Sequence, residues 1–186
     1  MQSIKFENVP DEFGLSVKVY PIVPSPGEVD INFDLVDCMA DGPSVGVVED
    51  SETKMDAIEL EDNSRVTFPV NCKYQYMALN VKNLDKFVAI TVTCKCTEGK
   101  IREVVLSNRR SNIAINGNSC QAPLLLGDGW QYLNVDIEKL LNNAFGVSLD
   151  CTLQITVTGS TRLGKLYLQE SEYADAELPP FLRLIQ

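Results

Sequence analysis

The sequence predicts an all-β protein, an antiparallel β-sandwich of the jelly-roll type with one short α-helix near residues 137–145. Three observations support this. Most apolar residues alternate with polar ones over short runs, as in strands that bury one face. Gly, Pro and Asn separate these runs at short intervals, and only one segment has helical spacing. About nine or ten amphipathic strands must bury their apolar faces against one another, which two packed sheets achieve.

The first third of the chain contains the first expected strands. Residues 16–23 (SVKVYPIV) and 28–36 (EVDINFDLV) alternate apolar and polar positions on either side of the turn PSPG. The runs SVGVV, MDAIELE and RVTFPV continue the pattern, and we expect acidic or Asn-containing connectors such as EDSETK and EDNS to interrupt them. No linker separates these runs from the rest, so residues 1–186 are expected to form a single domain.

The middle of the chain predicts a β-hairpin. KYQYMALNV leads through KNLDK into FVAITVTCKC, and TEGK then turns the chain back into IREVVLSN. Gly99 can adopt a positive φ in this turn, as hairpin connections require.

The one helix follows the strand GWQYLNV. Asp136 is a good N-cap, because its carboxylate can accept hydrogen bonds from the free N–H groups of the first turn. Gly146 suits the left-handed position that ends a helix. The apolar residues between them form one stripe, which predicts a lid over an open end of the sandwich: Ile137, Leu140, Leu141, Ala144 and Phe145.

The last third returns to a period of two. In CTLQITVTG the residues at 151, 153, 155 and 157 share one face, and we expect GSTR to turn the chain into LGKLYLQE as a second hairpin. The closing segment ESEYADAELPPFLRLIQ is expected to be an extended tail fixed by its prolines.

Charge is distributed unevenly along the chain. The formal net charge is −10, but residues 1–63 contain 3 Lys and Arg against 15 Asp and Glu, whereas residues 64–186 contain 13 against 11. An acidic surface gains no binding free energy from contact with phosphate backbones or anionic lipid, because like charges repel. We therefore expect neither nucleic acid nor membrane as a partner.

The same composition predicts a cytosolic chain with reduced thiols. No apolar run approaches the roughly 18 residues of a membrane span, and residues 1–14 lack the features of a secretory signal. The six cysteines lie in apolar or alternating segments, as buried thiols do: Cys38, Cys72, Cys94, Cys96, Cys120 and Cys151.

The chemistry of a typical active site is missing from the sequence. The chain has no histidine, which excludes Ser-His and Cys-His dyads and His-ligated zinc. Acidic residues lie in polar connectors, and no phosphate-binding glycine pattern occurs. We expect no enzyme, no cofactor and no metal. A four-cysteine site around Cys94 and Cys96 is the alternative to buried thiols.

Several motifs in the second part of the chain resemble a known family when taken together. They are KNLDKF (82–87), the SN of VLSNRRS (Ser107 and Asn108), DGW (128–130) followed by a strand and a short helix ending in AFG, and ELPPFLRL (177–184). In this order they resemble the cilia- and flagella-associated protein 20 family, the inner-junction proteins of doublet microtubules. The resemblance is strongest over residues 64–186; before that, only GLSVKVY and MDAIELE are similar.

The resemblance implies a compact, non-enzymatic β-sandwich in the axoneme of motile cilia and flagella. Members of the family are cytoskeletal proteins that lie where the B-tubule closes onto the A-tubule. Their partners are tubulin, the parkin co-regulated protein and other inner-junction proteins, and they are also linked to basal bodies and centrioles.

One difference from the family concerns charge, because its typical members are basic and suit the acidic surface of tubulin. We therefore expect the nearly neutral residues 64–186 to face tubulin. The partner-binding residues predicted on this basis are Lys82, Lys86, Arg109, Arg110, Arg162 and Lys165. Two alternatives stay open: an adaptor of the same fold at centrioles or basal bodies, and a carbohydrate-binding module in which Trp130 stacks on a sugar.

Overall fold

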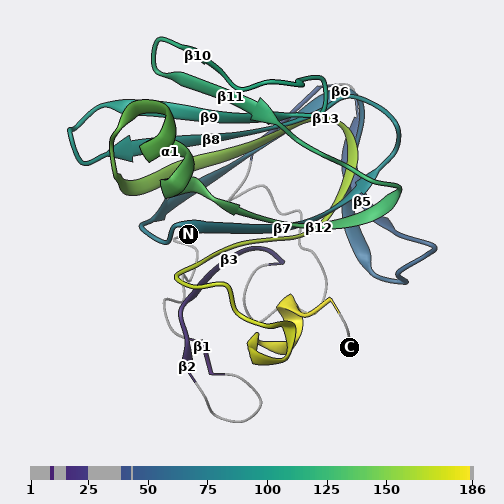
Figure 1. The fold of residues 1–186 in the computed structure, drawn as a ribbon. Helices are drawn as coiled ribbons and strands as arrows, with labels where there is room; N and C mark the ends of the chain where they lie inside the picture. Colours follow the sequence, from purple (N-terminus) through teal and green to yellow (C-terminus); the bar gives the residue numbers. More distant parts are fainter. Residues whose placement is uncertain (1–8, 11–15, 25–38, 43, 185–186) are drawn as a thin grey trace.

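The fold is a β-sandwich, as the sequence predicts (Figure 1). The computed structural model describes residues 9–10, 16–24, 39–42 and 44–184. Within them the strands are β1 (Val9–Pro10), β2 (Ser16–Val17), β3 (Val19–Val23), β4 (Met39–Asp41), β5 (Ser44–Glu49), β6 (Asp56–Cys72), β7 (Tyr76–Asn83), β8 (Val88–Cys96), β9 (Ile101–Ser107), β10 (Ala114–Asn116), β11 (Ser119–Pro123), β12 (Gly129–Asp136) and β13 (Leu149–Gln169). The helices are α1 (Ile137–Phe145) and the 3₁₀ helices η1 (Asp175–Glu177) and η2 (Pro180–Leu182). The strand predicted at 28–36 lies outside the described residues.

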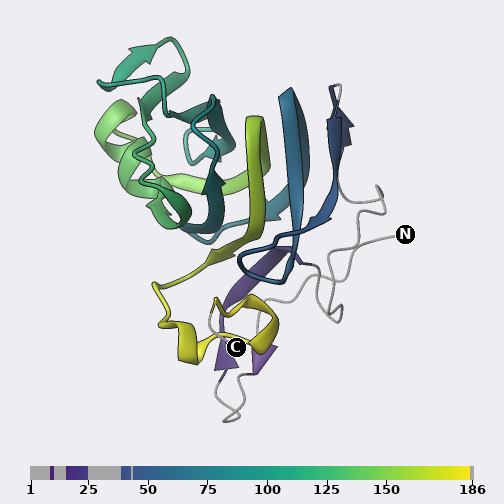
Figure 2. The ribbon, with the colours of Figure 1, turned by 90° about the vertical axis from the view of Figure 1, so that its right-hand side faces the viewer.

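The two layers share their central strands. One layer has the order β10, β11, β9, β8, β13, β6 and β4, and in the other β12 pairs with β7 and β7 with β13. β5 adds to the first half of β6, and β3 to the last residues of β13. β6 and β13 lie side by side and pass from one layer into the other (Figure 2). The sandwich is therefore one continuous sheet folded along a pair of bent strands.

The second predicted hairpin is wrong, because β13 continues through GSTR as one strand of 21 residues. Gly159 has φ 122° and its place in β13 is a bulge, where the pairing with β6 shifts register. The N–H of Ser160 bonds to the carbonyl of Phe87. Glycine here bends a strand between layers, rather than ending it in a turn.

The predicted EDNS connector is wrong for the same reason. β6 runs through it as one strand of 17 residues. Asp62 and Asn63 both have positive φ, 54° and 57°, and lie opposite the bulge of β13. Asn and Asp tolerate this conformation better than other residues with side chains, so these two residues bend β6 where β13 also bends.

The β8–β9 hairpin and α1 confirm the prediction. β8 pairs with β9 in antiparallel register, and Gly99 has φ 90° in the turn. The Asp136 side chain accepts a hydrogen bond from the N–H of Lys139, and Gly146 ends α1 in the left-handed conformation. One pair differs from an antiparallel sandwich: β11 runs parallel to β9, because β10 intervenes between them along the chain.

The main core lies between the layers, and α1 closes one end of it. Ile137 and Leu141 are fully buried in this core, and Leu140 and Phe145 pack against it. Cys38 lies outside the described residues, and the other five cysteines form no disulfide with one another. Cys72, Cys94, Cys96 and Cys120 are buried, as predicted, and Cys151 is half-buried. Burial raises the pKa of the Cys94 thiol to about 12.

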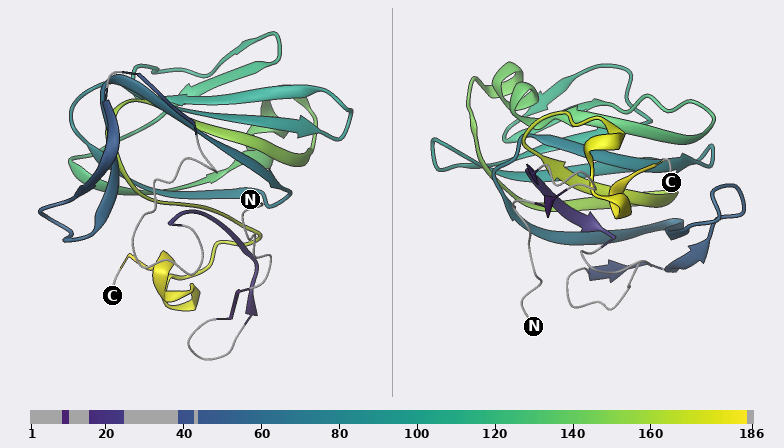
Figure 3. Two further views of the ribbon diagram at one scale, coloured as in Figure 1. Left: turned by 180° about the vertical axis from the view of Figure 1, so that it is seen from behind. Right: turned by 90° about the horizontal axis from the view of Figure 1, so that it is seen from below.

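The C-terminal segment covers the outer face of the second layer. The prediction of an extended tail is wrong, because this segment forms η1 and η2. Both lie across this face in the view from below (Figure 3). Leu178 and Leu182 are buried in a second, smaller core with Tyr167 of β13 and Val19 of β3. β7 and β13 are therefore buried on both faces.

We predict that Gly159→Ala lowers the free energy of unfolding by about 3 kcal/mol or prevents folding. A Cβ atom here would overlap the carbonyl oxygen of Phe87, and φ is positive. Gly99→Ala is the matched control, since φ is also positive but a Cβ would meet open space, so only a strain of about 1–2 kcal/mol is expected. Urea denaturation measures both. Equal losses would show that the close approach at Gly159 does not constrain the fold.

Candidate functional site

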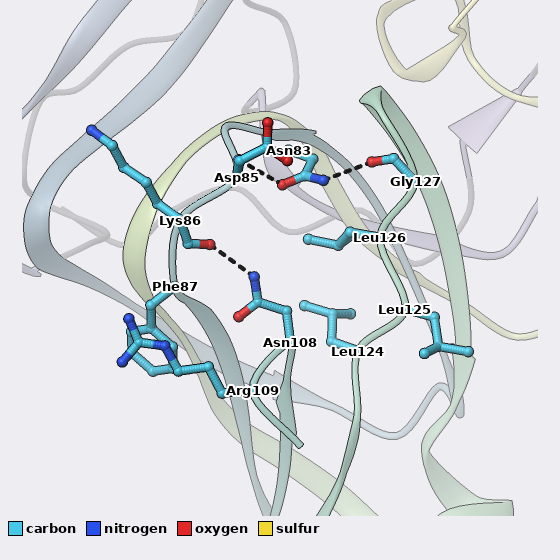
Figure 4. Close-up of a pocket in the computed structure, with 10 residues that line it drawn as sticks. All are labelled: Asn83, Asp85, Lys86, Phe87, Asn108, Arg109, Leu124, Leu125, Leu126 and Gly127. Atoms are coloured by element: carbon cyan, nitrogen blue, oxygen red, sulfur yellow. Dashed lines mark hydrogen bonds between the residues drawn. The ribbon is translucent and has the colours of Figure 1, made fainter. Parts of the chain in front are cut away.

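Three of the motifs that carry the family resemblance meet at the end of the sandwich opposite α1: KNLDKF, the SN at 107–108 and the loop that leads into DGW. The loop from β7 to β8, the segment after β9 and the loop from β11 to β12 surround a surface pocket of about 630 Å³ (Figure 4). The pocket and α1 lie at opposite ends of β7. The first residue of α1 bonds to Gln75, just before β7 begins, whereas Asn83 at the end of β7 lines the pocket. The pocket is lined by Asn83, Asp85, Lys86, Phe87, Asn108, Arg109, Leu124, Leu125, Leu126 and Gly127.

Asn108 holds the β7–β8 loop against β9. Its Oδ1 accepts a hydrogen bond from the N–H of Val88 at 3.0 Å, and its Nδ2 donates to the carbonyl of Lys86 at 2.8 Å. Both polar atoms of this amide therefore bond within the protein. The wall that Asn108 forms is fixed before any partner arrives.

Asn83 joins the same loop to the loop that precedes β12. Its Nδ2 donates to the carbonyl of Gly127 at 2.8 Å, and its Oδ1 accepts from the N–H of Asp85 at 2.9 Å. Asp85 itself has a φ of 56°. The third connection runs from the N–H of Leu124 to the carbonyl of Ser107 at 2.9 Å. Side-chain and backbone bonds thus lock the three loops together.

The pocket has an apolar floor and a charged rim. Leu124 is buried and Leu126 half-buried, and both side chains point toward the centre of the pocket (Figure 4). Leu125 points away from it and is 82% exposed. At the rim the Arg109 guanidinium lies over the Phe87 ring, 4.6 Å from its centroid.

A buried carboxylate, Asp50, ties the loop between β5 and β6 to the second layer. Its Oδ2 accepts hydrogen bonds from Lys82 Nζ at 3.0 Å and from Arg162 Nη1 at 2.6 Å. Its Oδ1 accepts from Trp130 Nε1 at 3.2 Å and from the N–H groups of Glu52 and Thr53. One fully buried side chain therefore connects β7, β12 and β13 with its own loop.

The ionisation of Asp50 follows from these contacts. Burial raises the pKa of the carboxyl, but hydrogen bonds from Arg162, Lys82, Thr53 and Trp130 outweigh it and hold the pKa well below its usual range. The bonds to Asp50 raise the pKa of Lys82 and of Arg162 in turn. Glu59 also accepts from Arg162, at 2.6 Å. This cluster is structural, because its charges satisfy one another.

Trp130 does not form an open platform for a sugar. The indole is half-buried, donates its N–H to Asp50 and lies against Gly164, where an added Cβ would be 3.2 Å from the ring. The carbohydrate-binding alternative required an exposed ring in a groove.

The structure divides the six predicted partner-binding residues. Lys82 and Arg162 bond to Asp50 inside the protein, and Lys165 is 7% exposed and donates to the carbonyl of Phe181. Burial lowers the pKa of Lys165. The other three are exposed: Lys86, Arg109 and Arg110. Lys86 and Arg109 line the pocket, so two of the six predicted residues coincide with the site.

The described residues offer little else for chemistry. Among them, no group of three or more His, Cys, Asp and Glu side chains is placed to hold a metal ion. No described helix is both long and apolar enough to cross a membrane. Sequence analysis missed Asp50, which stands in an acidic connector like its exposed neighbours. Asn83 and Asn108 belong to the motifs it did single out.

Comparison with known proteins identifies relatives of this chain. Residues 32–186 match the model of the CFA20 domain. Cilia- and flagella-associated protein 20 of Chlamydomonas reinhardtii is 22% identical over 74% of this chain and 77% of its own. The Caenorhabditis elegans protein of that name is also 22% identical, over 74% and 72%. The Paramecium tetraurelia protein is 24% identical over 60% of this chain, and the match spans only 59% of the Paramecium protein.

Solved structures with a similar arrangement of strands include carbohydrate-binding modules of family 11 from Clostridium thermocellum. One has a TM-score of 0.43 at 9% identity, covering 76% of this chain and 92% of its own. Another, in complex with a β-1,3-1,4-mixed-linked tetrasaccharide, has a TM-score of 0.45 at 10% identity, covering 84% and 98%.

We predict that Asp50→Asn lowers the free energy of unfolding by about 2–4 kcal/mol at pH 7, because charged hydrogen bonds to a buried group are lost. The pKa of Asp50 is depressed in the folded state, so its contribution is complete above about pH 4 and declines as pH falls further. The gap between wild type and variant in urea denaturation should narrow below pH 4. A gap that stays constant to pH 2 would contradict this.

We predict that Asn108→Ala speeds hydrogen exchange at the amide of Val88 and lowers the free energy of unfolding by about 1–3 kcal/mol, since two hydrogen bonds disappear. Asn118→Ala, at an exposed amide, is the control. Unchanged exchange at Val88 would mean that the loop is held by other contacts.

Proposed function

The chain belongs to the CFA20 domain family, and from this premise we propose that it is a non-enzymatic structural protein of the cilium or flagellum. The match of the family model to residues 32–186 carries the proposal. The names of the relatives, which associate them with cilia and flagella, support it. Most of the chain takes part in this match, so the role belongs to the sandwich rather than to an appended segment.

Within the axoneme, we propose that the chain is an inner-junction component that bridges the A- and B-tubules of doublet microtubules. Its partners there are tubulin, the parkin co-regulated protein and other inner-junction proteins. A protein repeated along a lattice needs no tight single contact, because neighbouring sites raise the effective concentration of each copy. A rigid body also loses little conformational entropy on docking.

The pocket end supplies a surface that suits such docking. Lys86, Arg109 and Arg110 are exposed there, and no ion pair joins any of them to a described acidic residue. Tubulin presents an acidic surface, so these cations can face it although the chain as a whole is acidic. Lys82, Arg162 and Lys165 are not part of this proposed surface, because they bond inside the protein.

We predict that a fluorescently tagged copy in flagellated cells lies along the whole axoneme and remains there after detergent extraction. This follows if the chain binds a microtubule lattice rather than a soluble partner. Restriction to basal bodies or centrioles would favour the adaptor of the same fold. A cytosolic protein that detergent removes would contradict a structural role in the axoneme.

We predict that the double variant Arg109→Glu and Arg110→Glu binds purified axonemes about tenfold more weakly in co-sedimentation, because two attractive charges become repulsive. Lys100→Glu is the control, since this exposed lysine lies in the turn at the other end of β8. If both variants bind as wild type does, the arginine pair does not lie in the contact surface.

A further inference from the structure

We propose that the pocket between the three loops binds an acidic linear peptide segment of a partner protein. An apolar side chain of the peptide packs on Leu124 and Leu126, and a neighbouring carboxylate bonds to the Arg109 guanidinium. This inference deepens the proposed function by naming the chemistry of the docked partner. Its test does not depend on the cilium.

The unpaired state of Arg109 is the first observation behind this inference. The chain has 26 acidic and 16 basic residues, so an acidic partner for each arginine is plentiful. Arg65, Arg102 and Arg162 each form an ion pair, and Arg183 donates to backbone carbonyls. Among the described residues, no group accepts a hydrogen bond from the guanidinium of Arg109 or of its exposed neighbour Arg110, and no acidic side chain forms an ion pair with either; of the two, Arg109 lines the pocket. Its donors are available to an external carboxylate.

The position of Arg109 is also fixed in advance. The guanidinium stacks on Phe87, and the N–H of Arg109 donates to Ser107 Oγ at 3.2 Å. Stacking uses the flat face of the group and leaves the N–H donors at its edge free. A carboxylate that binds here meets a charge that is already held in place, which reduces the entropy lost on binding.

The floor explains why the ligand must carry an apolar group beside its acid. Leu124 is 6% exposed and belongs to the main core, and Leu126 is half-buried against the same core, so a small apolar surface is left at the bottom of the pocket. The amides of Asn83 and Asn108 already bond within the protein. A volume of about 630 Å³ is in the usual range for ligand pockets. A fully polar ligand, such as a sugar or a phosphate, would cover the two leucines without forming an apolar contact or a hydrogen bond with them.

The backbone beside the floor suits an extended peptide. Residues 124–127 follow β11 but pair with no strand. No backbone hydrogen bond joins Leu125 or Leu126 to another described residue. Leu124 and Gly127 at the ends of this segment bond within the protein, so the backbone groups open to a peptide are those of Leu125 and Leu126, which can pair with an extended chain as peptides do in β-strand addition. Apolar floor, fixed cation and free backbone together match a peptide.

The test is selection from a library of random 12-residue peptides displayed on phage, with the purified full chain as bait. We expect enriched peptides to share Asp or Glu within a few residues of Leu, Ile or Phe. In fluorescence polarisation, Arg109→Glu should lower the affinity for the best synthetic peptide by about tenfold or more. The control Lys100→Glu, with the same change of charge, should bind as wild type does. Melting curves establish that both variants fold.

Hydrogen exchange of the wild-type complex gives a second measurement that needs no variant. The peptide should slow exchange at residues 108–110 and 124–127. The proposal is overturned if no acidic peptide is enriched, if Arg109→Glu binds normally, or if protection lies elsewhere. Should the chain lie along axonemes and yet fail here, only the pocket assignment is wrong. Peptide binding in a chain that is absent from cilia would instead overturn the proposed function.

Discussion

The structure depends on one pair of strands. β13 and β6 stay paired where the sheet bends from one layer into the other. Both strands bend at the same level, one at the Gly159 bulge and the other at Asp62 and Asn63. The absence of a side chain at Gly159 lets Phe87 approach, and Phe87 directly precedes β8. A side chain there would push Phe87 and the start of β8 away from β13, at the point where the β7–β8 loop ends. The position of the pocket loops therefore follows from this one close approach.

The two ends of the sandwich consequently have different roles. At one end α1 covers the core with Ile137 and Leu141, so that end is closed by apolar packing. At the other end, amide and backbone hydrogen bonds hold three loops around a pocket that stays open. Between the two ends, Asp50 stiffens the second layer. Its carboxylate accepts hydrogen bonds from a lysine of β7, an arginine of β13 and the indole of β12. A stiff body with a preformed pocket is suited to docking.

Local patterns in the sequence predicted the class of fold, the β8–β9 hairpin and the capped helix, because each of these is determined by residues close together along the chain. They failed at β6 and β13, since Gly159 or EDNS has the same composition whether the chain turns or only bends. The choice depends on a partner strand nearly a hundred residues away. In the same way, a lysine or arginine in the sequence does not reveal whether it meets Asp50 or solvent, which is why only Lys86 and Arg109 of the six predicted cations line the pocket. The motif residues Asn83 and Asn108 were found, but their role as clamps required the structure.

We propose that this chain acts as a rigid body held between other proteins in the axoneme, with its loop end against a neighbour. Cryo-electron tomography of doublet microtubules, with subtomogram averaging of cells that carry a tagged chain, tests it most directly. The account predicts density for the sandwich at the inner junction, with the loops at 83–87, 108–110 and 124–127 in contact with adjoining protein density. Density elsewhere on the doublet, or a sandwich whose loop end faces open solvent, would contradict it.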